Sequence, residues 1–578
     1  MTNARRSLVI LLLIAAGAGA LLAFKPSQDP DLWWHLATGR LALATRSTLP
    51  TDPFSFSFYG APWPQKDVVA AVGIWLAFAA AGFVGLWLVS ALAAASMVLG
   101  WRQLTARSWP ILVALLVTLP LLQWTQRPNL LSLALFPTVL ALLERRRWAW
   151  LVLVSWIWIV LHRAALLGYA LILGRALQQL VARLCARWPR LTLVAGAPPT
   201  PRELALAWLA AVAAPLVGLC NPSGRAAFTT SVALVESDVQ RIYIAEWRRL
   251  GLAALEGWAG VLFAVAALLV VARLVVAVRR RQRAPVDLWH LALLVLFAVM
   301  ATQRLRWLPY LPLACALVLL LLVDEAVARL PPPTLKRLPL TPALVLLLLA
   351  ACLAARRGAP WTLGEDRGVE PSDAVDFART HQLDGPVISS FEFGGYLIYR
   401  GLPVLVDGRL EQLYPPAFVA TCIQAERNPA FLAQLPLDDV TWAIGSNGDA
   451  RFTHRYLYRD PRWMMVYWSD AASVYVLRAA HPELASLAFV AIDPAAPERS
   501  AAEAARSPDD RYVAAARAEL QRMLTASPTS LRANSALAIW FHLTGHAAER
   551  DVVMRVLHAV AADHPAVREL DRRFGSKP

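Results

Sequence analysis

The sequence predicts a polytopic α-helical membrane protein whose last third is water-soluble. Hydrophobic residues make up 58 % of the 578 positions and charged residues only 17 %, with a mean hydropathy of +0.48. That composition is too apolar for a soluble chain of this length. The apolar runs all lie before residue 357, and beyond it hydropathy falls and short strand-like runs alternate with helical ones.

Apolar runs of about 17–25 residues are long enough to cross a bilayer as helices, and about eleven occur. They are 7–24, 83–101, 109–125, 129–144, 148–162, 165–186, 203–220, 255–278, 286–303, 306–323 and 339–356. A further apolar stretch, 68–80, is short, and we expect it to be re-entrant or interfacial. The first run follows Arg5 and Arg6 without a small-residue cleavage site, which predicts a retained span rather than a removed signal peptide.

The loops between these runs predict the orientation. With the N-terminus in the cytoplasm, every cytoplasmic loop is basic, as the positive-inside rule requires. These loops carry Arg102 and Arg107; Arg145, Arg146 and Arg147; Arg187, Arg190 and Arg202; Arg279, Arg280, Arg281 and Arg283; and Lys336 and Arg337. The formal charge of +16 therefore reflects membrane topology and not nucleic-acid binding. Because the count is odd, residues after 357 lie outside.

The five cysteines do not suggest a disulfide framework or a metal site. They are widely spaced and form no CxxC pair, and four of them lie in or beside apolar runs.

The first outside loop begins with the most distinctive stretch of the chain, residues 29–35. It combines two carboxylates, Asp29 and Asp31, with two tryptophans and His35 where the chain leaves the membrane. Carboxylates at such a boundary are costly to desolvate and usually have a partner or a task. The structural alternative is a turn with interfacial anchors, since Asp-Pro starts turns, Asp caps helices and Trp favours the interface.

Several cations lie on the outside face, where the positive-inside rule disfavours them. The candidate ligand-binding residues of the outside loops are Arg127, His162, Arg163, Arg225, Glu246, Arg304 and Arg306. An arginine cluster at one membrane boundary can hold a lipid-linked phosphate through bidentate hydrogen bonds. The alternative is that each arginine neutralises a nearby carboxylate or extends to lipid headgroups.

Residues 358–480 predict a small extracytoplasmic α/β domain. The strand-like runs are 385–390, 396–399, 403–407, 442–444, 463–468 and 473–477, and a helix is expected to begin near Ser372 or Asp373, one of which caps it. Gly394, Gly395 and Asp407 suit either a ligand-binding loop or ordinary turns. No phosphate-loop or dinucleotide fingerprint is present, because the glycine spacing fits neither.

Residues 497–578 are rich in alanine and arginine with helical periodicity. Helix pairs joined through Ser527-Pro528 and Thr544-Gly545-His546 are similar to tetratricopeptide repeats. A simple helical cap is the alternative. A function for this tail would be protein contact rather than catalysis.

This layout resembles the GT-C superfamily, multi-span glycosyltransferases that use polyprenyl-phosphate-linked sugars. The motifs behind the resemblance are Asp29 to Gly39, Leu49 to Ser55, Asn221 to Gly224, Glu246-Trp247, Gly394 to Leu397 and Asp407 to Arg409. The resemblance covers most of the chain to about residue 480, and it implies a multi-pass protein of the bacterial inner membrane. The partners that it implies are a lipid-linked sugar donor in the bilayer and a glycan or protein acceptor.

In such enzymes an acidic residue of the first outside loop is the catalytic base or a metal ligand. Here that role falls on Asp29 or Asp31, and the metal would be a divalent cation such as Mg²⁺ or Mn²⁺. The base takes the acceptor proton as an oxocarbenium-like centre develops, and positive charge stabilises the departing phosphate. His35, one helical turn from Asp31, would hydrogen-bond that carboxylate or bind acceptor, and this spacing slightly favours Asp31.

Two other classes of function compete with the transferase. One is a non-catalytic assembly protein that binds partners through its outside domain and helical tail, for which Asp29 and Asp31 would be dispensable. The other is a transporter, against which stand the few charges within the apolar runs and the lack of an inverted repeat of broken helices.

Overall fold

The computed structural model describes residues 3–65, 67–230, 238–330, 340–426, 428–447, 456–494 and 496–575. The chain divides into two compact units. The first comprises Met1–Pro50 and Trp63–Gly364, and the second comprises Thr51–Pro62 and Glu365–Pro578. The second unit therefore takes in a short segment of the first predicted outside loop.

The first unit is helical. Its helices are α1 (Asn3–Ala23), α2 (Pro30–Thr45), α3 (Val68–Arg102), α4 (Ser108–Thr118), α5 (Pro128–Glu144), α6 (Trp148–Leu161), α7 (Ala165–Leu184), α8 (Pro189–Ala195), α9 (Pro201–Gly218), α11 (Asp238–Tyr243), α12 (Trp258–Arg280), α13 (Leu288–Gln303), α14 (Tyr310–Arg329) and α16 (Leu340–Ala355). Each of the predicted apolar segments overlaps one of these helices. Within the described ranges, 6 helices are long and apolar enough to cross a membrane, so the predicted count of eleven stays a prediction.

The short apolar stretch 68–80 and the predicted span 83–101 form the two halves of α3. The helix breaks at Ala81 and Gly82, and Gly82 has a φ of 56°, a left-handed conformation that suits glycine. The first half is thus a separate helical segment that is too short to span by itself.

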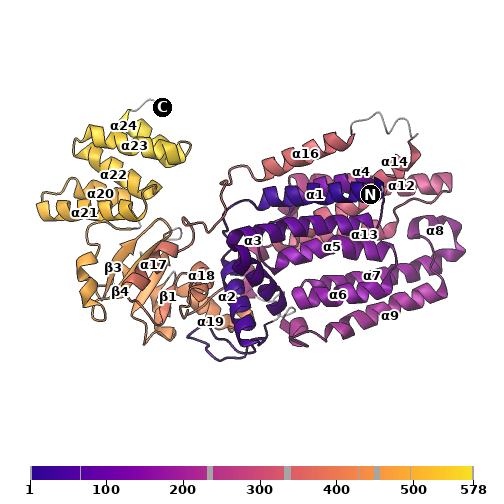
Figure 1. Ribbon diagram of the computed structural model, residues 1–578, viewed down its shortest axis with the longest axis horizontal. Coiled ribbons are helices and arrows are strands. Elements are labelled where there is room, and N and C mark those ends of the chain that lie inside the picture. Colours follow the sequence, from indigo (N-terminus) through magenta and orange to yellow (C-terminus); the bar gives the residue numbers. More distant parts are fainter. Residues whose placement is uncertain are drawn as a thin grey trace. The chain divides into compact units, whose positions relative to one another are not determined.

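The outer faces of the long helices expose large apolar side chains. Leu13 of α1, Leu92 of α3 and Leu268 of α12 are each about two-thirds exposed, at 67 %, 68 % and 69 %. Such surface is unfavourable in water and suits contact with lipid. Helix α2 differs, because it runs across the direction of α1 and α3 and buries both of its tryptophans (Figure 1).

The second unit contains a four-stranded sheet made of β1 (Val387–Ser389), β2 (Trp442–Ser446), β3 (Trp463–Trp468) and β4 (Ala472–Leu477). The strand order is β1-β2-β4-β3, with β1 parallel to β2 and the other pairs antiparallel. The helices α17 (Ser372–Thr380), α18 (Gly394–Tyr399) and α19 (Pro416–Ala425) complete this mixed α/β fold.

Three local predictions in this domain were wrong. Residues 396–399 form helix α18 and not a strand, because a short apolar run does not distinguish a buried helical turn from a buried strand. The run 403–407 makes isolated bridges through Val404 and forms no strand of its own. The N-cap of α17 is Pro371 and not Ser372 or Asp373, and its side chain cannot cap.

The C-terminal helices are α20 (Pro497–Ala504), α21 (Asp510–Ala526), α22 (Leu531–Leu543), α23 (Ala547–Ala561) and α24 (Pro565–Phe574). Their apolar side chains share one hydrophobic core with the sheet, to which Trp468 and Tyr475 contribute from the strands and Leu520 and Trp540 from the helices. The tail is thus built into the domain. Its relation to tetratricopeptide repeats stays a prediction.

Candidate functional site

The distinctive acidic stretch forms the start of α2. Asp29 is the N-cap, and its carboxylate accepts the backbone N–H of Asp31 at 3.1 Å, with Pro30 in the first turn. This satisfies an otherwise unpaired helix N–H and places two carboxylates at the positive end of the helix dipole. The indole Nε1 of Trp34 donates to Oδ1 of Asp31 at 3.1 Å. The cap predicted by the structural alternative is present, and it leaves the carboxylates engaged in further contacts.

Arg127 is the centre of the site. It lies at the N-cap position of α5, and its guanidinium faces three carboxylates from distant parts of the chain. Nη1 donates to Oδ2 of Asp31 at 2.6 Å, Nη2 donates to Oε1 of Glu246, and Nε lies 3.2 Å from Oδ2 of Asp29. The side chains of Arg127 and Asp29 are each only 9 % exposed. One buried cation therefore holds an excess of negative charge.

Glu246 links Arg127 to a second arginine. It lies in a 3₁₀ turn, Ala245–Trp247, and its Oε2 accepts from Nη1 of Arg306 at 2.9 Å. The guanidinium of Arg306 also lies over the indole of Trp247, 5.5 Å from the ring centroid. This cation–π contact helps to fix the second arginine.

The electrostatics of the cluster favour protonation of Asp29. Burial and the neighbouring carboxylates outweigh the attraction of Arg127 and raise the pKa of Asp29 to about 6. Burial opposes the charge of Arg127, but the three carboxylates overcome that penalty and raise the guanidinium pKa. Burial opposes the charge of Glu246, but the charges of Arg127 and Arg306 outweigh that penalty and lower the pKa of Glu246.

Two buried histidines and Arg163 lie in the same electrostatic environment. Burial lowers the pKa of His35 well below the ordinary value, and the charges of Arg127 and Arg163 add to this effect. His35 stacks on Trp34 at 3.6 Å, and His162 shares a hydrogen bond with Ser132 at 2.7 Å. The lowered pKa favours the neutral form of His35.

A cavity of about 520 Å³ opens beside this cluster. Asp29, Arg127 and Glu246 line it, as do Lys25 and Arg357. Oδ2 of Asp29 is buried and accepts no hydrogen bond from any described residue, because Arg127 Nε is close but poorly aligned. A carboxylate oxygen with spare accepting capacity at a cavity is suited to take a proton from a bound hydroxyl.

The basic residues of the cavity are not equivalent. Arg356 is tied to backbone carbonyls, including those of Phe24 at 2.6 Å and Pro360 at 2.9 Å, and it lies over the ring of Trp361. It therefore serves the junction between the ends of α1 and α16. Lys25 and Arg357 are exposed, and their charges remain available to a ligand, although partial burial and the charge of Arg356 lower the pKa of Lys25.

The remaining predicted site residues divide into two groups. Arg163 lies near Arg306, Asp67, Asp31 and Arg127, its Nη1 is buried without a described hydrogen-bond partner, and burial lowers its pKa to about 10. By contrast, Arg225 is exposed. Arg304 donates to the carbonyl of Gln303 and lies among Arg241 and Arg249 rather than among the carboxylates. None of Arg163, Arg225 and Arg304 lines the cavity.

The donor set does not fit a divalent metal ion. The oxygens of Asp29, Asp31 and Glu246 converge on the guanidinium of Arg127, which occupies the place that a cation would take. Across the described residues, no group of three or more His, Cys, Asp or Glu side chains is arranged to hold a metal. The fixed positive charge of this site is an arginine.

Sequence reasoning missed Lys25, Arg357 and Trp34 as parts of the site. Lys25 and Arg357 flank the first and last apolar helices, where a basic residue is usual and carries no special signal. The position of Trp34 suggested an interfacial anchor, and the spacing of His35 to Asp31 predicted that His35 would hydrogen-bond this carboxylate. The side chain that reaches Asp31 is that of Trp34, one position before His35.

No protein-family model and no curated protein matches the sequence. Among solved structures, the chain is similar to ArnT from Cupriavidus metallidurans bound to undecaprenyl phosphate, with 16 % identity, a TM-score of 0.47, and coverage of 83 % of this chain and 98 % of that one. It is also similar to the arabinofuranosyltransferase AftD from Mycobacteria, with 15 % identity and a TM-score of 0.46, covering 81 % of this chain and 40 % of that one.

At TM-scores below 0.5 and identities near 15 %, this likeness does not assign an activity to the chain. The functional argument therefore depends on the site itself.

Proposed function

We propose that the protein is a membrane glycosyltransferase that moves a sugar from a polyprenyl-phosphate-linked donor to an acceptor outside the cytoplasm. The observation that carries the proposal is the cavity, in which Asp29 has a raised pKa and a free accepting oxygen while Lys25 and Arg357 present available positive charge. A base and a phosphate-binding pair are the two groups that this chemistry needs.

The position of the cavity favours a lipid-linked phosphate. Lys25 follows the apolar helix α1 and Arg357 follows the apolar helix α16, so both cations lie where a hydrocarbon-facing surface ends. A polyprenyl chain would lie along such helices, and its phosphate would meet the two cations at the boundary. We propose that the N-terminus faces the cytoplasm of a bacterial inner membrane and that the second unit is extracytoplasmic, as the basic loops predict.

The proposed reaction is a single displacement at the anomeric carbon. Asp29 removes the proton of the acceptor hydroxyl, whose oxygen forms the new bond to the anomeric carbon. The bond from that carbon to the phosphate oxygen breaks, and its electron pair stays on the phosphate, where Lys25 and Arg357 stabilise the added charge. Arg127 holds Asp29 and Asp31 in place. Asp31 accepts a hydrogen bond from Arg127, whereas Oδ2 of Asp29 accepts none from any described residue, so Asp29 is the proton acceptor.

Binding of undecaprenyl phosphate to the full-length protein in detergent tests the lipid site. Lys25→Ala and Arg357→Ala should each weaken binding about ten-fold, since each removes a charge-assisted hydrogen bond. Arg225→Ala is the matched control, because Arg225 is exposed on the same predicted face but does not line the cavity. Unchanged affinity in the Lys25→Ala, Arg357→Ala double variant would contradict the site.

The assembly-protein alternative predicts instead that substitution of Asp29 has no effect on function. Deletion of 497–578 is a poor way to separate the two functions, because those helices share a hydrophobic core with the sheet. Substitution of Asp29 in the intact chain separates them cleanly.

A further inference from the structure

The segment Thr51–Pro62 packs in a different unit from the residues that precede and follow it in the chain. Residues before and after it belong to the first unit, whereas the segment itself belongs to the second. Its ends are held together, since Thr51 and Pro62 form an antiparallel bridge and the N–H of Asp52 donates to the carbonyl of Ala61 at 2.8 Å. The two units are therefore joined by three chain connections, at 50–51, 62–63 and 364–365, rather than by one.

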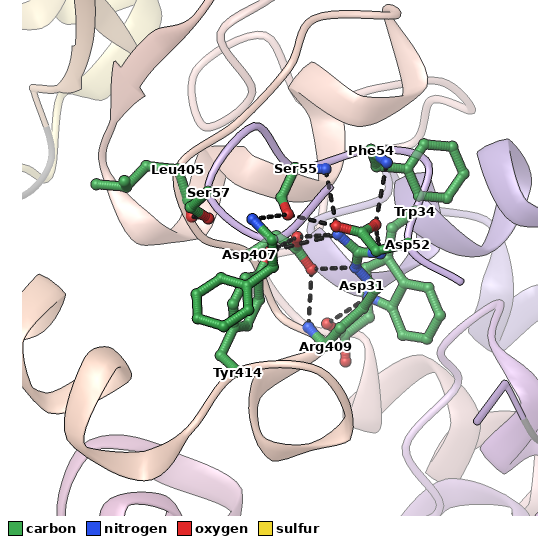
Figure 2. A network of polar contacts seen from close by, with 11 residues as sticks. Asp31, Trp34, Asp52, Phe54, Ser55, Ser57, Leu405, Asp407, Arg409 and Tyr414 are labelled. Atoms are coloured by element: carbon green, nitrogen blue, oxygen red, sulfur yellow. Dashed lines mark hydrogen bonds and ion pairs between the residues drawn. The ribbon is translucent and has the colours of Figure 1, made fainter. Parts of the chain in front are cut away.

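A buried ion cluster fixes this segment within the second unit. Arg409 donates through Nη1 to Asp52 and through Nε and Nη2 to Asp407, at 2.8 and 2.7 Å for the latter pair. Tyr414 also donates to Asp407, and the side chains of Arg409, Asp52 and Asp407 are all 0 % exposed. Figure 2 shows Asp52, Asp407, Arg409 and Tyr414 directed toward one another. We name these four residues the Arg409 cluster.

Backbone and aromatic contacts extend the attachment. Ser55 forms a parallel bridge with Val404, which in turn bridges to Val387 of β1, so the segment lies alongside the edge of the sheet. The N–H of Phe56 donates to the carbonyl of Val404 at 3.0 Å. The ring of Phe58 packs edge-on against Tyr414 at 5.4 Å and Phe418 at 4.9 Å. Addition of a strand-like segment to a sheet edge supplies both affinity and register.

The other end of the segment leads to the candidate active site. Trp63 follows Pro62 directly, is fully buried, and donates its backbone N–H to the carbonyl of Pro50 at 2.8 Å. Its ring packs edge-on against Trp34 at 6.4 Å, and Trp34 in turn hydrogen-bonds Asp31. A restraint on segment 51–62 is thus a restraint on Trp63, and through it on the indole that orients Asp31.

We propose that the outside domain positions the active-site helix α2 through segment 51–62, with Trp63 and Trp34 as positioning residues for Asp31. The Arg409 cluster fixes the segment, the paired ends of the segment fix Trp63, and the Trp63–Trp34 contact fixes the carboxylate. The proposal rests on the proposed function only in treating Asp31 as part of an active site. The coupling itself is a physical property that can be measured without substrate.

Hydrogen exchange of the full-length protein in detergent, followed by mass spectrometry, tests the coupling. Asp52→Asn weakens the Arg409 cluster while keeping the size of the side chain. It should speed exchange about three- to ten-fold in residues 51–62 and also in residues 31–36 at the start of α2. Asp376→Asn is the control, since it removes an ion pair with Arg400 on the surface of the same domain, and it should change neither region.

A second variant works from the opposite end of the path. Trp63→Phe should speed exchange in residues 31–36 and leave residues 387–406 of the domain unchanged. Arg409→Lys replaces Asp52→Asn if the latter does not fold. The proposal is overturned if the cluster variants speed exchange only in residues 51–62 and 387–406 while 31–36 keep the wild-type rate, or if Trp63→Phe leaves 31–36 unchanged. If the wild type shows neither lipid binding nor turnover while the exchange results agree with the coupling, only the proposed function is contradicted.

Discussion

Two arginines with at least two carboxylate partners each, Arg127 and Arg409, occupy different kinds of environment. Arg409 and its two carboxylates are fully buried, and every polar atom of these side chains has a partner. Arg127 faces three carboxylates beside a cavity, and its Nε and the facing oxygen of Asp29 lack a well-aligned hydrogen bond. The composition of the two clusters is similar, and their hydrogen-bond saturation differs.

This difference separates a structural cluster from a candidate site. A buried charge network is stable only when its members are paired and hydrogen-bonded, so a saturated network has no capacity left for a ligand. An unsaturated network with access to a cavity retains a proton acceptor and charges that a substrate can use. Matched substitutions in the two clusters test this comparison.

The largest effect on stability is expected in the saturated cluster. Arg409→Met leaves Asp52 and Asp407 buried without their cation, and this should lower the free energy of unfolding of the second unit by about 3–5 kcal/mol. Thermal unfolding of the full-length protein measures it, with Asp376→Asn as the control that removes a surface ion pair and should leave stability unchanged. Near-wild-type stability of Arg409→Met would remove the basis of the comparison.

The pH dependence of stability should depend on Asp29. Because its pKa rises from 3.8 in the unfolded chain to about 6 in the folded one, the folded state binds the proton more tightly. Its contribution is full below pH 4 and is lost as pH rises through 6, which lowers the free energy of unfolding by up to about 3 kcal/mol. Unfolding of the wild type and Asp29→Asn at pH 4 to 7 measures the difference. Parallel curves for the two proteins would show that the pKa of Asp29 is not raised.

The matched substitution in the unsaturated cluster should be milder. Arg127→Met leaves three carboxylates together, but Asp29 and Glu246 line the cavity and Asp29 can take up a proton. We expect a loss of about 1–3 kcal/mol in the free energy of unfolding, less than for Arg409→Met. The same unfolding experiment compares the two variants, and a larger loss for Arg127→Met would reverse the assignment of structural and functional roles.

The smallest effect distinguishes two neighbouring arginines. Arg306→Ala removes one hydrogen bond to Glu246 and should lower stability by about 1 kcal/mol. Arg304→Ala should have no measurable effect, because Arg304 contacts a backbone carbonyl and lies among other arginines. Equal effects of the two substitutions would show that the cluster is less specific than the contacts indicate.

Much of the helical half could be predicted from the sequence, because a continuous apolar run of spanning length is a strong signal for a membrane helix. The sequence also indicated that Asp29 and Asp31 would meet outside arginines, and the structure brings Arg127, Glu246 and Arg306 to them. It did not separate Arg163, which lies in this environment, from Arg225 and Arg304, which do not. Loop cations of one type look alike until the fold places them.

Other features lay beyond any local pattern. The partners Asp52 and Arg409 lie 357 residues apart in the sequence, and both lie in short sequence motifs that also fit ordinary turns. The helix 394–399 resembled a strand because its apolar run is too short to show a period. Close packing explains the glycine at its first position, since a Cβ on Gly394 would lie 2.6 Å from the carbonyl oxygen of Val406.

The measurement that tests the central claim most directly is turnover of Asp29→Asn beside Asp31→Asn. The full-length protein would be supplied with a panel of synthetic polyprenyl-phosphate sugars and membrane glycans, and release of polyprenyl phosphate would be followed against pH. With Asp29 as the base, wild-type turnover should rise with pH through about 6, and Asp29→Asn should lose about 10²- to 10⁴-fold while remaining folded. Wild-type turnover in folded Asp29→Asn would contradict the account.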